Sequence, residues 1–148
     1  MAKHQLYQDF IQRLEASLAD GHYFESAWYS YAVLEDRLRS LLRNSGGETI
    51  IGTHKPIRMM GPKLRELKAR LKKDKLLAAT FTDDLHDRLH QWKSTRNDLM
   101  HAMADASMPL SDIDAFAKTL ATDGEVLVRD FCAACRRLKT HRAKVTPK

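Results

Sequence analysis

The sequence predicts an all-α protein, an antiparallel bundle of four to five helices in a single domain of 148 residues. Apolar residues recur at helical spacing in nearly every segment, and no segment alternates apolar and polar residues as a half-buried strand does. Glycine and proline are few, six and four residues, so they leave long segments uninterrupted. We expect the bundle core over about residues 5–140 and a basic tail at 141–148.

The first helix is expected over about residues 5–18 and ends before Gly21. Its apolar residues, Leu6, Phe10, Leu14 and Leu18, follow one another at steps of four. The second helix is expected over 23–43, with an apolar seam interrupted by one charge: Phe24, Trp28, Tyr31, Glu35, Leu38 and Leu42. Residues 45–60 are the one long irregular stretch.

The third helix is basic and is expected from Pro62, a favoured first-turn residue, to about Lys73, with a short continuation allowed through KLLAA. Thr82 is the expected cap of the fourth helix, which runs to about residue 104. Ser111 is the expected cap of the last helix, which runs to about residue 139. The capping-box spacing of TDGE permits a break near Gly124.

Positive charge is concentrated in two stretches of a chain whose net charge is +6. Residues 55–75 hold nine Lys and Arg against two acids, and residues 136–148 hold six against none. Clustered cations favour a polyanionic partner, nucleic acid above all. The alternative is a solvated lysine-rich face. The residues of the basic helix expected to bind nucleic acid, RNA if the family resemblance described below holds, are Lys63, Arg65, Lys68, Arg70, Lys72 and Lys73.

The sequence also limits the compartment and the cofactors. The N-terminal stretch lacks the apolar core of a secretory signal, and no run is apolar enough for a membrane span. Cys132 and Cys135 form no disulfide framework, so we expect a cytoplasmic protein with two core thiols rather than a zinc site. His86 and His90 have the spacing of a helical metal pair, but no further ligands accompany them. We expect surface histidines, no metal and no cofactor.

The segment STRNDLMHAMAD, residues 94–105, holds the candidate site residues. At about 100° per residue, Arg96 falls on the apolar stripe of the fourth helix and His101 lies roughly 140° away on its polar face. An arginine on a buried stripe needs an acceptor, and Glu35 is the expected partner. The alternative is that this pair only fixes the register of the bundle. The stripe consists of Leu85, Leu89, Trp92, Leu99 and Met103.

Arg96-Asn97-x-x-x-His101 resembles the signature of the HEPN superfamily, helical domains named for higher eukaryotes and prokaryotes nucleotide-binding. In that signature a polar residue, often asparagine, follows the arginine, and a histidine comes a few residues later. The order of helices is similar, and YAVLEDRLRSLL resembles the second helix of the family, including an acidic residue. The resemblance covers about residues 5–140.

The resemblance implies a metal-independent endoribonuclease of a toxin or phage-defence system, acting as a homodimer with its motif in a cleft between protomers. Attack by the 2′-hydroxyl of RNA would leave 2′,3′-cyclic phosphate and 5′-hydroxyl ends. His101 is expected to move a proton, Arg96 to hold the scissile phosphate, and Asn97 to orient the phosphate or the histidine. An antitoxin or regulatory protein is a further expected partner. Met103 stands where one branch of the family carries a tyrosine modified with AMP, so that control is not expected.

A straight helix does not point Arg96 and His101 at one atom. Either the helix unwinds near Asp98, or a twofold axis brings two motifs together, and we favour the dimer. The main alternative function is a non-catalytic HEPN-like dimeric regulator or RNA/nucleotide-binding module in which Arg96 serves structure. A DNA-binding regulator ranks lower, because no helix-turn-helix pairing precedes a recognition helix.

Overall fold

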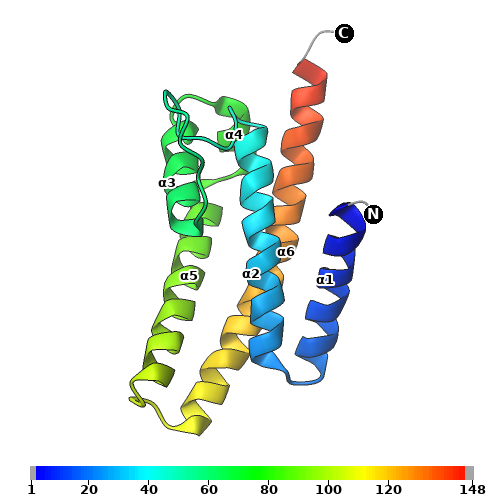
Figure 1. Cartoon of the computed structure of the whole chain (residues 1–148). Coiled ribbons are helices and arrows are strands. Elements are labelled where there is room, and N and C mark those ends of the chain that lie inside the picture. The colour runs from blue at the N-terminus through cyan, green and yellow to red at the C-terminus, as the bar shows by residue number, and fades with distance from the viewer. Residues whose placement is uncertain (1–2, 146–148) are drawn as a thin grey trace. The chain divides into compact units, whose positions relative to one another are not determined.

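Helices make up most of the computed structural model, which describes residues 3–145. Within that range no strand is present, and an isolated antiparallel bridge joins Thr49 to Pro56. The predicted all-α class is confirmed. Residues 3–145 form six helices rather than the expected four to five, because KLLAA begins a separate short helix (Figure 1). These are α1 (Lys3–Ala19), α2 (Tyr23–Arg43), α3 (Met60–Leu71), α4 (Lys75–Thr80), α5 (Asp83–Ala104) and α6 (Leu110–Val145).

The chain divides into two compact units, and α2, α5 and α6 each contribute to both. Unit 1 comprises Met1–Leu34 and Gln91–Val128, and therefore contains α1 and segments of the three long helices. Unit 2 comprises Glu35–His90 and Arg129–Lys148, and contains α3 and α4 as well. None of the helices within residues 3–145 combines the length and apolar character that crossing a membrane requires.

In unit 1, α2 buries small residues and exposes large ones. Ser26 and Ala27 are buried, and the Ser26 hydroxyl donates to the carbonyl of Leu14 on α1 at 3.3 Å, so the two helices approach closely. Trp28 consequently lies on the outside, 72% exposed, and Phe24 is exposed beside it along the helix. The expectation that these two aromatics begin the buried seam of α2 was wrong.

Gly124 explains why α6 continues where a break was expected. The helix is unbroken from Leu110 to Val145, and Gly124 is buried within it. A Cβ atom at this position would lie 3.0 Å from Ser30 Oγ and 3.1 Å from Trp92 Cζ2. The glycine therefore permits close packing of α6 against α2 and α5 within unit 1, rather than ending a helix.

Unit 2 has a core of leucines and two phenylalanines, with Phe81 and Phe131 at 5.7 Å between ring centres. His86 was expected on the surface, but it is only 6% exposed and meets Phe81 edge-on. Its Nδ1 lies 3.0 Å from Asp87, and that hydrogen bond lowers the pKa of the Asp87 carboxyl. His90 is exposed, as expected.

Helix capping follows the sequence at one expected site and departs from it at another. Thr82 Oγ1 accepts from the backbone N–H of Leu85 at 3.2 Å, which confirms the predicted cap of α5. Ser111, by contrast, lies inside α6, which begins one residue earlier. The carbonyl of Pro109 accepts from the N–H groups of Asp112 and Ile113, both at 3.0 Å, so backbone groups form this first turn.

Candidate functional site

The three motif residues lie on the last turns of α5, all in unit 1. α5 is helical without interruption from Asp83 to Ala104, so it does not unwind at Asp98. One of the two ways of directing Arg96 and His101 at a single atom is thereby removed. Asn97 and His101 are exposed, and Arg96 is half-buried.

Arg96 has an aromatic partner that the sequence motif does not contain. Its guanidinium carbon lies 4.2 Å from the centre of the Tyr31 ring on α2. Nη1 also donates to Asn97 Oδ1 at 3.4 Å, a long hydrogen bond to the next residue in the motif. A guanidinium over an aromatic face is attracted by the electron density of the ring, which offsets part of the cost of half-burying the charge. Tyr31 therefore sets the direction of the Arg96 side chain.

Glu35, the expected acceptor for Arg96, has a different cation within its own unit. Its carboxylate forms an ion pair with Lys63 of α3, whose side chain is almost completely buried. Arg96 belongs to unit 1 and Glu35 to unit 2. Each of the two charges that interrupt an apolar seam thus has a partner in the unit to which it belongs, and a Glu35–Arg96 contact stays a prediction.

The basic helix α3 turns two of the six expected RNA-binding residues inward. Lys63 and Arg70 are each 3% exposed and hold protein partners, so the basic surface does not include them. The other four residues, Arg65, Lys68, Lys72 and Lys73, are exposed. Lys68 lies 3.9 Å from the exposed carboxylate of Asp87, a distance at which a solvated pair contributes little.

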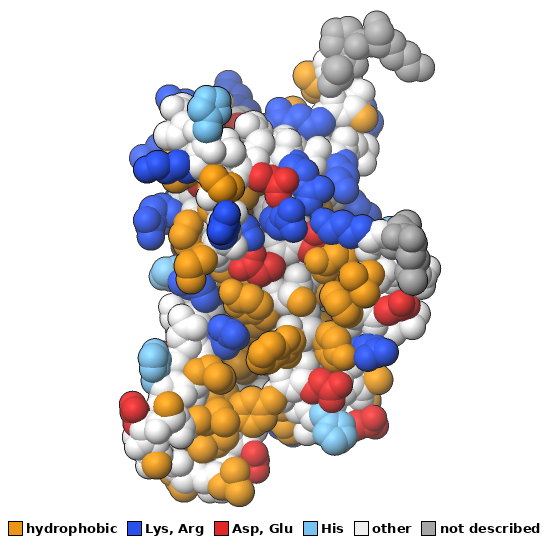
Figure 2. All heavy atoms as spheres, in the orientation of Figure 1, with side chains coloured by type: hydrophobic (Ala, Val, Ile, Leu, Met, Phe, Trp, Pro, Cys, Tyr) orange, Lys and Arg blue, Asp and Glu red, His pale blue; other side chains and the backbone are white. Residues whose placement is uncertain are grey.

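Charge and apolar surface are divided between the two units. Unit 1 holds five Lys and Arg against ten Asp and Glu, a formal charge of −5, whereas unit 2 holds twenty against nine, +11. In Figure 2, Lys and Arg gather over unit 2 and hydrophobic side chains gather over unit 1. Met103, expected in the core, is among the exposed apolar residues. The others in unit 1 are Leu6, Phe24, Trp28, Met100, Leu110, Phe116 and Val126.

The two cysteines belong to unit 2, and neither is bonded to the other. Cys135 is buried, as predicted, and burial raises the pKa of its thiol to about 11. Cys132 is half-buried, and burial raises its pKa as well. A thiol held in its neutral form is a poor nucleophile and a poor metal ligand.

Residues 3–145 contain no group of three or more His, Cys, Asp or Glu side chains arranged to hold a metal ion. Comparison of the chain with protein-family models, curated proteins and solved structures finds no match.

Proposed function

We propose that this chain is a metal-independent endoribonuclease of HEPN type that acts in the cytoplasm as a toxin or phage-defence effector, under an antitoxin or another regulatory protein. One observation carries the proposal: on a single uninterrupted helix, Arg96 is oriented by Tyr31 beside Asn97, and His101 stands exposed one turn further along. These side chains supply a phosphate ligand, an amide and a proton-transfer group without a protein nucleophile.

The reaction uses the 2′-hydroxyl of the RNA as the nucleophile. One histidine takes the 2′ proton as the 2′-oxygen bonds to phosphorus, and a protonated histidine donates to the 5′-oxygen as the P–O5′ bond breaks. Arg96 holds the scissile phosphate and stabilises the extra negative charge of the pentacoordinate transition state. The products are a 2′,3′-cyclic phosphate and a 5′-hydroxyl. A histidine suits both proton steps because its ordinary pKa is close to neutral pH.

The proposal requires a homodimer. In-line displacement needs a base and an acid on opposite sides of phosphorus, and the straight α5 carries one motif histidine. A twofold axis would bring His101 from each protomer to one phosphate. Unit 1, which carries the motif, also carries exposed aromatic and methionine side chains such as Trp28 and Met100, the residue types that protein interfaces favour.

Mixed dimers test this arrangement. His101→Ala protein is mixed with wild type, the subunits are allowed to exchange, and the cleavage rate is followed at constant total protein. A site that needs both histidines predicts a rate proportional to the square of the wild-type fraction, because every heterodimer is inactive. A rate that falls linearly with the wild-type fraction would show that each protomer cleaves by itself.

A second candidate function is a non-catalytic RNA-binding module. The charge distribution favours it, because unit 2 carries a formal charge of +11 whereas the unit with the motif carries −5. In this alternative the stacking of Arg96 on Tyr31 serves only packing. Affinity for RNA would then remain unchanged in His101→Ala, and no fragment would appear with wild type.

A further inference from the structure

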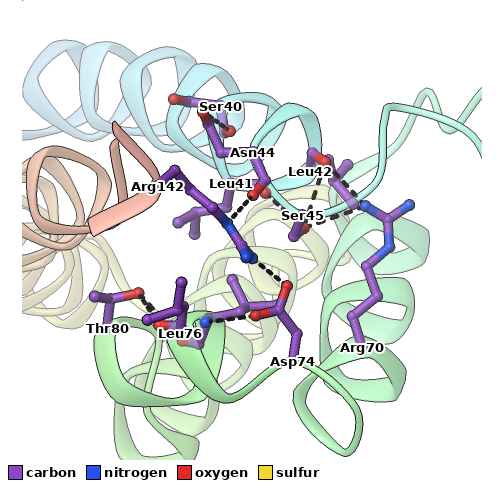
Figure 3. Close-up of polar contacts among 11 residues, drawn as sticks. Ser40, Leu41, Leu42, Asn44, Ser45, Arg70, Asp74, Leu76, Thr80 and Arg142 are labelled. Carbon is purple, nitrogen blue, oxygen red and sulfur yellow. Dashed lines mark hydrogen bonds and ion pairs between the residues drawn. The ribbon is translucent and has the colours of Figure 1, made fainter. Parts of the chain in front are cut away.

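Unit 2 contains an open pocket of about 720 Å³, which no part of the motif enters. Pockets that bind small molecules commonly measure about 300 to 1,000 Å³. Figure 3 shows the polar contacts around it, with Arg70 and Arg142 directed toward the chain that follows α2. The residues that matter for its chemistry are Ile51, Arg70, Lys73, Lys75, Leu76 and Arg142.

Arg70 lines the pocket, and its guanidinium donates all of its hydrogen bonds to other groups of the protein. Nε donates to Glu66, Nη1 to the Leu42 carbonyl and the Ser45 hydroxyl, and Nη2 to the carbonyls of Gly47 and Thr49. A guanidinium has five N–H groups, so all of them are used. Arg70 therefore fastens the loop after α2 onto α3 and fixes the shape of the pocket, rather than binding a ligand itself.

Arg142 also lines the pocket and remains partly open to solvent. Its Nε donates to the Asn44 carbonyl at 2.9 Å, and its Nη2 forms an ion pair with Asp74. Asp74 also caps α4 through the N–H of Leu77 at 3.0 Å. The arginine side chain is 33% exposed, and its charge is engaged by Asp74.

The charges that line the pocket do not balance. Its two acids are each engaged by an arginine, Glu66 by Arg70 and Asp74 by Arg142. Lys73 and Lys75 are exposed at the rim and form no ion pair with any residue in the range 3–145. Lys73 and Lys75 are therefore available to an anionic ligand, and the apolar side chains of Ile51 and Leu76 line the same pocket.

We propose that this pocket binds a mononucleotide, with its phosphate at Lys73 and Lys75 and its base against Ile51 and Leu76. Two exposed lysines attract a phosphate, and apolar lining residues of the same pocket accept the face of a heterocycle. The nucleotide is either free in solution or the terminal nucleotide of an RNA strand. The proposal stands apart from the motif of α5, because none of its residues lies in unit 1.

Calorimetric titration of the full chain tests the proposal, with adenosine 5′-monophosphate, adenosine and inorganic phosphate as probes. The monophosphate should bind in the millimolar range or tighter, and more strongly than either fragment. Lys73→Gln/Lys75→Gln should weaken its binding about tenfold or more, since two charge-assisted hydrogen bonds are removed. Ile51→Ser should weaken binding of the monophosphate but leave the affinity for inorganic phosphate unchanged. Lys3→Gln/Lys118→Gln removes the same charge from unit 1 and serves as the matched control.

A second comparison identifies the source of the nucleotide. A short oligoribonucleotide with a terminal phosphate and one without are each titrated, and the monophosphate is added as a competitor. Preference for the phosphorylated end indicates an RNA terminus, and binding of the monophosphate alone indicates a free nucleotide. The proposal would be overturned if about 10 mM monophosphate, roughly ten times a millimolar dissociation constant, gave no heat of binding. It would also be overturned if Lys73→Gln/Lys75→Gln and the control Lys3→Gln/Lys118→Gln weakened binding of the monophosphate equally. Both results are independent of RNA cleavage.

Discussion

The guanidinium of Arg96 lies 4.2 Å from the centre of the Tyr31 ring, and this contact orients the first residue of the motif. It joins α5 to α2 within unit 1 and leaves Asn97 and His101 facing solvent. An arginine held by a ring rather than by a carboxylate keeps its full positive charge available to a phosphate, because the ring carries no net negative charge.

A double-mutant cycle measures that contact. Tyr31→Leu removes the ring, and Arg96→Met removes the charge while keeping much of the side-chain length. We expect a coupling free energy of about 0.5–1 kcal/mol between the two changes, from the cation–π attraction at a half-exposed site. Urea unfolding of the four proteins provides the free energies. Additive effects would mean that the ring does not hold Arg96.

Gly124→Ala should destabilise the protein although alanine is the better helix former. The new methyl group would lie 3.0 Å from Ser30 Oγ and 3.1 Å from Trp92 Cζ2, and Trp92 is held by its hydrogen bond to the Leu120 carbonyl. Overpacking costs about 1–3 kcal/mol, against about 1 kcal/mol gained in helix propensity. We expect a net loss of about 1 kcal/mol by thermal or chemical unfolding. Combining the change with Ser30→Gly should reduce the loss from overpacking, and a stabilised Gly124→Ala protein would contradict this packing.

The exposed cations of α3 should carry the affinity for RNA. Arg65→Gln/Lys72→Gln removes two such charges at and just after the helix, and we expect weaker binding of single-stranded RNA irrespective of its sequence. The slope of log affinity against log salt should fall by about 0.7 for each phosphate that the protein no longer neutralises. Fluorescence anisotropy over a series of salt concentrations gives both values. Lys3→Gln/Lys118→Gln has the same net charge, so an equal weakening in that protein would exclude a localised basic surface.

The Cys135 thiol should make stability decrease at high pH. Burial raises its pKa from 9.0 to about 11, so the folded state holds this proton more tightly than the unfolded state does. Its contribution to the free energy of unfolding is complete below about pH 9 and is lost as the pH rises toward 11. Urea unfolding between these pH values should show the decrease, and Cys135→Ala should show a smaller one. An unchanged slope in that variant would assign the decrease to other groups.

The sequence predicts helices better than it predicts which faces they bury. α2 was expected over 23–43 and is found at Tyr23–Arg43, because a long amphipathic segment followed by NSGG defines both ends. The prediction that Trp28 lies on the buried face of this helix was wrong. Ser26 and Ala27 are buried instead, because small residues allow a closer approach of α1 than an aromatic seam does. Size as well as hydrophobicity therefore decides the buried face.

The spacing of residues in the sequence could not predict which side chains from distant segments contact one another. Lys63 and Arg70 belong to a basic helix, yet both are buried. Lys63 pairs with Glu35, and Arg70 donates to carbonyls of the last turn of α2 and of the loop after it. Residues 45–59 have no hydrophobic periodicity, so nothing in the sequence indicates that this loop folds back over α3. In the same way, the motif on α5 gives no sign that Arg96 meets Tyr31.

The measurement that tests the central claim most directly is RNA cleavage in EDTA. Wild type, His101→Ala and His22→Ala, which replaces another exposed histidine of unit 1, are incubated with total RNA and a tRNA pool. The fragment ends are then mapped. We predict that wild type and His22→Ala leave 2′,3′-cyclic phosphate and 5′-hydroxyl ends, and that His101→Ala leaves the RNA intact. Equal cleavage by folded His101→Ala would contradict the assignment of this histidine to the reaction.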